Sequence, residues 1–270
     1  IFLAAYRWHL LLRMDSRCHM SYRQTLSTNW IGLLFSTVAF GVLGGDMIKL
    51  FHAHKQDKNL SKKFLLTTIF LDRLIGLFGL VSLLGVSTLL FYQQVKHLSP
   101  VVRHLLHTNL ILLAGTMLVM ASLFFPATLK KFILSYTIKV PKLGKTLSEL
   151  FQEIWLIGTQ KMVFLKTYLI SLVLHIVTVL LILSYSHTLI TQEIPLYYGF
   201  VFIPMGLLFA ALPIAPAGLG VGHAAFGALF SYFGVKDGAS IFNVYFFILL
   251  VSYLFGLIPY FCRTSATCQI

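Results

Sequence analysis

Runs of mostly apolar residues recur along this chain, and several reach about 18 residues or more. A helix of about 20 apolar residues crosses the roughly 30 Å hydrocarbon layer of a bilayer. Of the 270 residues, 58% are hydrophobic and only 11% are charged, whereas a soluble domain carries about 25% charged residues. We therefore expect an all-α, polytopic bundle of membrane helices, with residues 1–270 forming a single transmembrane domain.

Apolar segments set the expected helices. An apolar stretch is already under way at Ile1 and ends at Arg13, so we expect a further helix before residue 1. The expected apolar segments are 1–12, 24–45, 66–92, 108–127, 165–186, 197–215, 221–234 and 240–262.

Lysines are distributed unevenly between the connecting segments. The loops 46–65 and 128–164 are rich in lysine, the loop 93–107 has one Lys and one Arg, and the loop 187–196 has neither. Because positive charge is retained on the cytoplasmic side, the two lysine-rich loops are predicted to be cytoplasmic.

The segment 24–45 conflicts with a simple alternation of spans. It has arginines before it and lysines after it, so a full crossing would place one basic cluster outside. A re-entrant hairpin would keep both clusters inside. An ordinary span with an imperfect charge bias is the alternative.

The stretch 141–164 has leucines and aromatic residues at helical spacing, with charged residues opposite them. It is interpreted as an amphipathic helix at the cytoplasmic membrane surface. A helix that packs on another loop is the alternative.

Two apolar segments are interrupted by glycine or proline. The first interruption contains Gly44, Gly45 and Asp46; the second runs from Pro213 to His223 and contains Pro216, Gly218, Gly220 and Gly222. Paired interruptions of this kind are typical of binding sites in transporters, and the free N–H groups at a half-helix N-terminus attract anions. The second interpretation is helix packing through small residues.

Asp72 and Arg73 lie six and seven residues into the span that starts at Leu66. Charges within a membrane are costly and are usually functional. Adjacent side chains point about 100° apart on a helix, so each needs a partner from another segment. Asp46 is a candidate for Arg73, or it pairs with Lys49 instead. A purely structural ion pair is the alternative to a functional one.

Several function classes have no support in the sequence. Cys18, Cys262 and Cys268 have no metal-ligand spacing, and the histidine groups have no carboxylate beside them, so no metal or other cofactor is expected. His175 is expected to be a buried, hydrogen-bonded residue. No hydrolase or nucleotide-binding motif occurs, and the net charge of +13 suits anionic lipid better than nucleic acid.

Four short motifs occur in a particular order: Arg7-Trp8, Gly44-Gly45-Asp46, Asp72-Arg73-Leu74 and Pro216-x-Gly218-Leu219-Gly220. In this order and spacing the chain resembles the lysylphosphatidylglycerol synthase transmembrane region family, from residue 5 to about residue 260. The resemblance implies a bacterial inner-membrane protein with re-entrant helices that translocates lipids or works beside a lipid- or glycan-modifying enzyme.

The chain also departs from the family pattern. Lys49 stands where members often have Arg, His223 where they often have Glu, and Gly76 near the place of a frequent Asp. No segment could form the aminoacyl-transfer domain of the synthase members, so we expect no enzymatic activity.

Two hypotheses follow. The first is translocation of an anionic or modified lipid between leaflets. The second is a non-catalytic membrane partner that positions a lipid-modifying enzyme or glycosyltransferase; a homo-oligomer is compatible with either. The residues expected to bind the lipid or its anionic group are Gly44, Gly45, Asp46, Lys49, Asp72, Arg73, Pro216, Gly218, Gly220, Gly222 and His223.

Overall fold

The computed structural model describes residues 1–38, 41–138, 144–145, 148, 151–152, 155, 158–189, 193–212 and 218–261. Within these ranges there are ten helices and no strand, which confirms the all-α prediction. The helices are α1 (Phe2–Leu12), α2 (Tyr22–Val38), α3 (Gly41–Gln56), α4 (Lys62–Val95), α5 (Pro100–Ser122), α6 (Ala127–Thr137), α8 (Lys161–Leu189), α9 (Leu196–Ala210), α10 (Val221–Ser231) and α11 (Gly238–Leu254).

Among the residues that the structure describes, four helices are long and apolar enough to cross a membrane: α4, α5, α8 and the stretch Gly238–Phe261 that α11 begins. Their apolar windows have mean hydropathies between 1.6 and 2.3. Large apolar side chains such as Ile111, Leu118 and Phe247 are exposed on α5 and α11. In a bilayer these side chains contact lipid tails, so their exposure carries no penalty.

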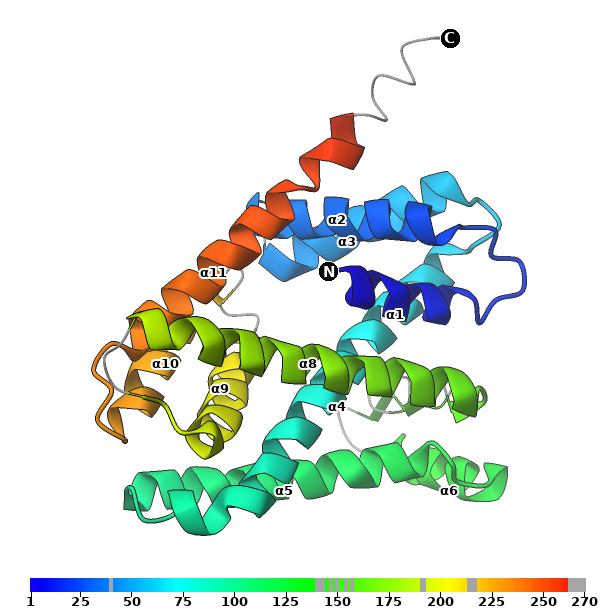
Figure 1. Ribbon diagram of the computed structural model, residues 1–270. Coiled ribbons are helices and arrows are strands. Elements are labelled where there is room, and N and C mark those ends of the chain that lie inside the picture. The colour runs from blue at the N-terminus through cyan, green and yellow to red at the C-terminus, as the bar shows by residue number, and fades with distance from the viewer. Residues whose placement is uncertain are drawn as a thin grey trace.

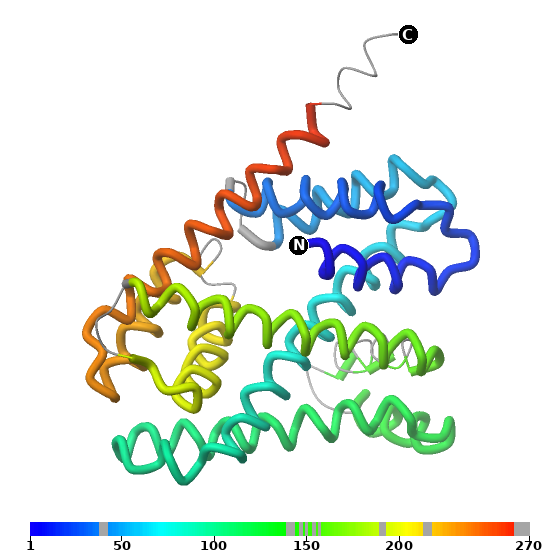
Figure 2. The backbone as a smooth tube through the Cα atoms, viewed as in Figure 1, coloured from blue at the N-terminus to red at the C-terminus, as the bar shows by residue number. Residues whose placement is uncertain are grey.

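The longest helix, α4, is the element around which the others pack. It contacts α1, α3, α5, α8 and α9, and it runs diagonally across the molecule (Figures 1 and 2). Ser61 caps its start, because the hydroxyl accepts a hydrogen bond from the Phe64 N–H at 3.1 Å. The position of α4 therefore decides which residues of distant segments can meet.

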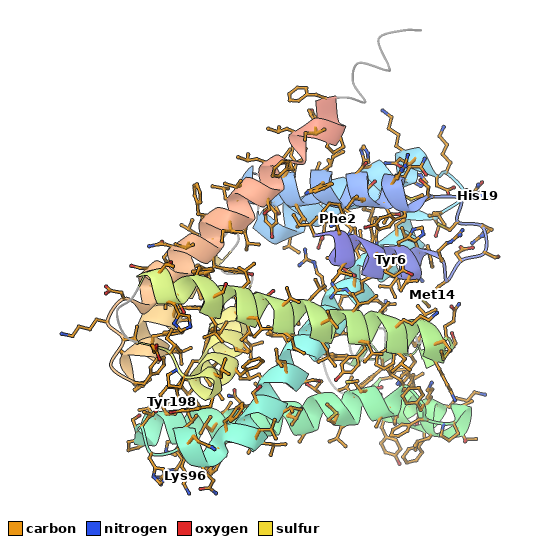
Figure 3. The ribbon with its side chains drawn as sticks, viewed as in Figure 1. Phe2, Tyr6, Met14, His19, Lys96 and Tyr198 are labelled. Atoms are coloured by element: carbon orange, nitrogen blue, oxygen red, sulfur yellow. The ribbon has the colours of Figure 1, made fainter. Side chains whose placement is uncertain are left out.

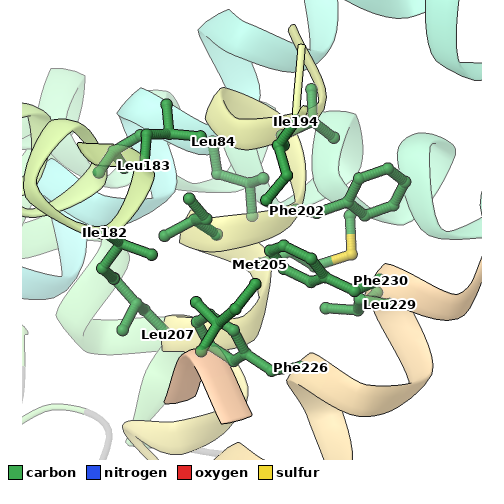
Figure 4. Packing of buried hydrophobic residues seen from close by; sticks show 14 of the residues in the cluster. Leu84, Ile182, Leu183, Ile194, Phe202, Met205, Leu207, Phe226, Leu229 and Phe230 are labelled. Carbon is green, nitrogen blue, oxygen red and sulfur yellow. The ribbon is translucent and has the colours of Figure 1, made fainter. Parts of the chain in front are cut away.

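The largest apolar core lies at the junction of α4, α8, α9 and α10. Phe202, Phe226 and Phe230 are fully buried there, next to Leu84 and Ile182 (Figure 4). Burying such side chains contributes about 1.5–3 kcal/mol each in water, and close packing takes over that role in lipid. This core fixes the second half of the chain on α4.

The first glycine motif lies on a helical hairpin. Helices α2 and α3 lie side by side and antiparallel (Figure 1), and the Gln56 amide at the end of α3 hydrogen-bonds to Thr28 near the start of α2 at 2.8 Å. Helices α2 and α3 therefore form a hairpin that extends to Gln56, beyond the end of the predicted segment 24–45. Gly44 and Gly45 lie within α3 and do not interrupt it, which corrects their expected role.

Gly45 allows the close approach of α2 and α3. A Cβ atom at this position would stand 2.4 Å from the Gly32 carbonyl oxygen and 2.8 Å from the Ser36 Cβ. Such distances cannot be accommodated without moving backbone. Glycine is thus required here by packing, as the small-residue interpretation proposed.

A second antiparallel pair is formed by α9 and α10. Gly206 on α9 faces the Phe226 ring on α10, and a Cβ at Gly206 would lie 2.5 Å from that ring. After α10, helix α11 runs back to the first hairpin (Figure 1), where the Trp30 indole donates to the Ser252 carbonyl oxygen at 3.2 Å.

Some predicted boundaries are wrong. Helix α5 begins at Pro100, eight residues before the expected start, because polar His104 and His107 belong to the helix. Helix α6 was not expected. Of the predicted amphipathic helix 141–164, the structure describes residues 144–145, 148, 151–152, 155 and 158–164, and the last four of these belong to α8.

Gly45→Ala is expected to lower the free energy of unfolding by about 1–3 kcal/mol, because the added methyl overpacks the α2–α3 contact. Gly115→Ala on α5 is the matched control, since a Cβ there meets nothing within 4 Å. SDS unfolding titrations of both variants check this. Equal stability of the two variants would contradict the close-packing role of Gly45.

Candidate functional site

Two charged side chains that lie within apolar helices pair with each other. Arg7 of α1 donates from Nε to Asp72 Oδ1 of α4 at 2.8 Å. Both residues are buried, with 8% and 9% of their surfaces exposed. Arg7 also donates from Nη1 to the Ser171 hydroxyl of α8 at 2.8 Å. One guanidinium therefore connects three helices.

Gly76 provides the space for this guanidinium. A Cβ at Gly76 would stand 3.2 Å from Arg7 Nη1, tighter than ordinary van der Waals contact. The Gly76 carbonyl oxygen is 3.0 Å from His175 Nε2 on α8, so the ring donates a hydrogen bond through Nε2–H. His175 is thus a hydrogen-bonded residue at the helix junction, as its isolated position in an apolar span suggested.

Lys49 of α3 is buried against an aromatic face. Its Nζ lies 3.9 Å from the centre of the Trp8 ring, and the residue is 6% exposed. Trp8 is fully buried, and its indole N–H donates to the Thr68 hydroxyl at 3.3 Å. The negative face of a tryptophan ring attracts a desolvated ammonium by about 2 kcal/mol.

The ammonium of Lys49 has no hydrogen-bond acceptor among the residues that the structure describes. Asp72 and Asp46 act on it electrostatically, but neither is bonded to it. The predicted alternative, an Asp46–Lys49 pair, is therefore not formed. An ammonium carries three N–H donors, so its hydrogen-bonding capacity is left for another group.

Arg73 pairs with Asp46 of α3, one of the two partners proposed for that aspartate. The contact joins Arg73 Nε to Asp46 Oδ2. The Arg73 side chain is 47% exposed and that of Asp46 is 19% exposed, so this pair is more accessible than the Arg7–Asp72 pair. Adjacent positions on α4 thus face different helices.

We call Arg7, Asp46, Lys49, Asp72 and Arg73 the polar cluster. It contains three cations and two carboxylates, so it keeps one net positive charge inside an apolar bundle. Both carboxylates are paired with arginines, and the charge in excess is that of Lys49. A site with this balance favours an anion over a cation.

The second glycine motif lies at the start of α10, against α11. Gly218 and Gly220 have φ values of +74° and +83°, which residues with side chains rarely adopt. A Cβ at Gly222 would lie 2.1 Å from the Phe242 ring, so this glycine lets α10 approach α11. Pro216 lies outside the described residues.

His223 caps this helix start. Its Nδ1 accepts the Gly220 N–H at 3.2 Å, which places the ring proton on Nε2, and Nε2 donates to Asn243 Oδ1 of α11. The side chain therefore has a structural role at the α10–α11 contact, in addition to its predicted place in a binding site.

Metal binding requires several ligands close together. Among the residues that the structure describes, no group of three or more His, Cys, Asp or Glu side chains could hold a metal ion. The polar cluster offers guanidinium and ammonium donors instead.

Comparison with protein families gives one result that covers almost the whole chain. The model of the family described as lysylphosphatidylglycerol synthase TM region matches residues 1–259. The chain belongs to this family. A search of curated proteins and a search of solved structures each found no match.

Membership of this family and the four long apolar helices together establish a multi-pass integral membrane protein. Of the residues expected to form a site, the fold brings Asp46, Lys49, Asp72 and Arg73 together. Gly45 supports them from α3, and the glycines of the second motif lie at α10.

Sequence reasoning did not include Arg7, Trp8, Thr68, Ser171 and Asn243 among the site residues. Arg7 offered a signal, because it is a lone cation in an apolar helix just as Asp72 is a buried anion in another. Ser171 and Thr68 offered none, since hydroxyls are common in membrane helices and usually bond to their own backbone.

Asp72→Asn is expected to lower the free energy of unfolding by about 3–5 kcal/mol, because it leaves the buried Arg7 charge without its counter-ion. The double variant Arg7→Met with Asp72→Leu is expected to recover most of that loss. Asp15→Asn is the control, since its partner Arg17 is exposed and little change is expected. SDS unfolding titrations measure all three.

Proposed function

We propose that this protein translocates an anionic or modified lipid between the leaflets of the membrane, and that the polar cluster binds the anionic headgroup on its way. The observation that supports this most strongly is the buried ammonium of Lys49, which lies on the Trp8 ring and has no acceptor among the described residues.

An unused buried donor has a free-energy cost of about 1–3 kcal/mol, and more when the group is charged. A phosphate oxygen removes that cost, because it accepts a short, charge-assisted hydrogen bond from the ammonium. The Asp72 and Asp46 carboxylates are already held by arginines, so they do not neutralise Lys49 by direct contact. The site is thus prepared for an anion from outside the protein.

The cations of the cluster differ in accessibility. The Arg73 side chain is 47% exposed, whereas Lys49 and Arg7 are 6% and 8% exposed as residues. In this proposal a headgroup first contacts the Arg73–Asp46 pair and then reaches Lys49, while Arg7 remains fixed by Asp72. Its acyl chains stay in the lipid throughout.

The proposal includes an orientation in the bacterial inner membrane. The segments 46–65 and 128–164 are rich in lysine, and we propose that both face the cytoplasm. No catalytic step is part of the proposal.

The test uses purified protein in liposomes that contain fluorescent phosphatidylglycerol, with dithionite quenching to follow movement between leaflets. Lys49→Met is expected to reduce the protein-dependent rate about tenfold or more, because one charge-assisted hydrogen bond contributes about 1.5–3 kcal/mol. Arg73→Ala is expected to reduce it as well. Lys49→Arg keeps the charge and is expected to retain most of the rate.

Lys55→Met is the matched control, because Lys55 is an exposed lysine at the end of the same helix. An unchanged rate in Lys49→Met would contradict the role of the polar cluster. Folded protein that moves no lipid in any variant would contradict translocation itself. It would favour the second hypothesis, a membrane partner that positions a transferase, which co-purification with such an enzyme would then support.

A further inference from the structure

Three tyrosines lead away from the polar cluster along helix α11. Tyr245 and Tyr253 lie on this helix, and Tyr185 lies in the last turns of α8. Tyr253 follows Tyr245 by eight residues, which places the two side chains about 12 Å apart along the helix axis and about 80° apart around it. They therefore share one side of α11. We call Tyr185, Tyr245 and Tyr253 the tyrosine row.

The Tyr253 end of the row lies beside the polar cluster. The Tyr253 side chain is within electrostatic range of the Arg73 guanidinium. The residue that precedes it accepts the Trp30 indole N–H with its carbonyl oxygen at 3.2 Å. Trp30 is two residues from Gly32, where a Cβ would stand 3.1 Å from the Lys49 Cβ. Helix α11 thus meets the α2–α3 hairpin next to the residues that carry the cluster.

The other end of the row lies where α8 and α11 meet. The Tyr185 hydroxyl donates to the Ile241 carbonyl oxygen in the first turn of α11 at 3.0 Å. Tyr245 lies one turn further along α11, within electrostatic range of both Tyr185 and Tyr253. Tyr185 and Tyr245 pack against the largest apolar core, as does Tyr198. Figure 3 shows Tyr198 at the end of the molecule opposite the connection from α1 to α2, so the row extends from the polar cluster toward that end.

The hydroxyls of Tyr245 and Tyr253 have no hydrogen-bond partner among the residues that the structure describes. Both residues are partly buried. A tyrosine hydroxyl in apolar surroundings usually has a partner, because the group can both donate and accept a hydrogen bond. The row therefore offers two unused polar groups on a helix that borders the largest apolar core.

Neutral hydroxyls suit an anion that has to leave a charged site. A path through a membrane needs binding that is strong enough for entry and weak enough for release, and several successive sites meet both needs. The cations of the polar cluster form strong, charge-assisted hydrogen bonds with an anion. A tyrosine O–H donates to the same anion without adding a charge, so the hold on the anion weakens as it moves from Arg73 to Tyr253.

We propose that the tyrosine row is the second part of the headgroup path. Tyr253 takes the anionic headgroup over from Arg73 by a hydrogen bond, and Tyr245 binds it next, on the way to the junction of α8 and α11. Tyr185 holds that junction through its bond to the α11 backbone. The row thus determines how fast a headgroup moves, whereas the polar cluster determines how well it first binds. This inference rests on the translocation proposal and adds residues that the polar cluster does not contain.

The test is the liposome assay with dithionite quenching, repeated at increasing fractions of fluorescent phosphatidylglycerol. Tyr245→Phe and Tyr253→Phe are each expected to lower the maximal rate about threefold to tenfold, because each removes one neutral hydrogen bond and keeps the ring. The lipid fraction that gives half of the maximal rate is expected to stay unchanged, since the polar cluster is intact. Lys49→Met is expected to raise that fraction. Tyr232→Phe is the matched control, because Tyr232 is a partly buried tyrosine that packs against the same core from the end of α10.

The outcomes separate this inference from the translocation proposal. If the unmodified protein moves lipid but Tyr245→Phe or Tyr253→Phe leaves the maximal rate unchanged, the tyrosine row is overturned and translocation stands. An equal loss of rate in Tyr232→Phe also overturns the row, because it would show a general effect of removing hydroxyls next to the core. A raised half-maximal fraction in the row variants overturns it as well, since the tyrosines would then act in first binding. Unmodified protein that moves no lipid contradicts translocation itself.

Discussion

The buried ion pair between Arg7 and Asp72 is the interaction on which the arrangement of this bundle depends. Removing two charges from water costs several kcal/mol each, and the pair is tolerable only because every contact is well made. Arg7 meets both Asp72 on α4 and Ser171 on α8 at 2.8 Å. These contacts require α1, α4 and α8 to occupy one relative position, since any shift would leave a charge uncompensated in a medium of low dielectric.

Arg7 and Lys49, the two buried cations of the polar cluster, have different roles. Arg7 is held by acceptors from two other helices, so it is structural, whereas Lys49 has an aromatic face and no acceptor among the described residues. Arg7 fixes the relative positions of α1, α4 and α8, and Lys49 is available to bind an anion. Gly76 allows Arg7 to take its structural position, because a residue without a side chain leaves room for the guanidinium beside α4. Arg7 occupies the space that a side chain at this position would fill.

Much of the fold could be predicted from the sequence because bilayer thickness fixes the length of apolar helices. The apolar segment 165–186 falls within α8, and the conflict between the two basic flanks of 24–45 indicated the α2–α3 hairpin. The start of α5 differs from the prediction because the polar residues His104 and His107 belong to the helix. Hydropathy is averaged over a window of residues, so the polar end of a helix has a low value and is assigned to the neighbouring loop.

The candidate site was only partly predictable, for a different reason. Asp72 and Arg73 stood out because charges in apolar helices are rare, and Asp46 was a reasonable partner for Arg73. The pairing of Asp72 with Arg7, 65 positions apart, depends on how α1 crosses α4. The place of Lys49 on the Trp8 ring depends on the same crossing. The spacing of residues along one helix does not show how that helix crosses another.

The return of α11 to the first hairpin has a consequence for how the protein is made. Trp30 bonds to Ser252, 222 positions later in the chain, and Gly256 lies so close to Trp30 that a Cβ would stand 2.6 Å from its carbonyl oxygen. During synthesis the hairpin leaves the ribosome long before its last neighbour exists. Until α11 is inserted, the indole N–H of Trp30 has lipid, a headgroup or another protein as its surroundings. The first hairpin therefore lacks part of its packing until α11 has been synthesised and inserted.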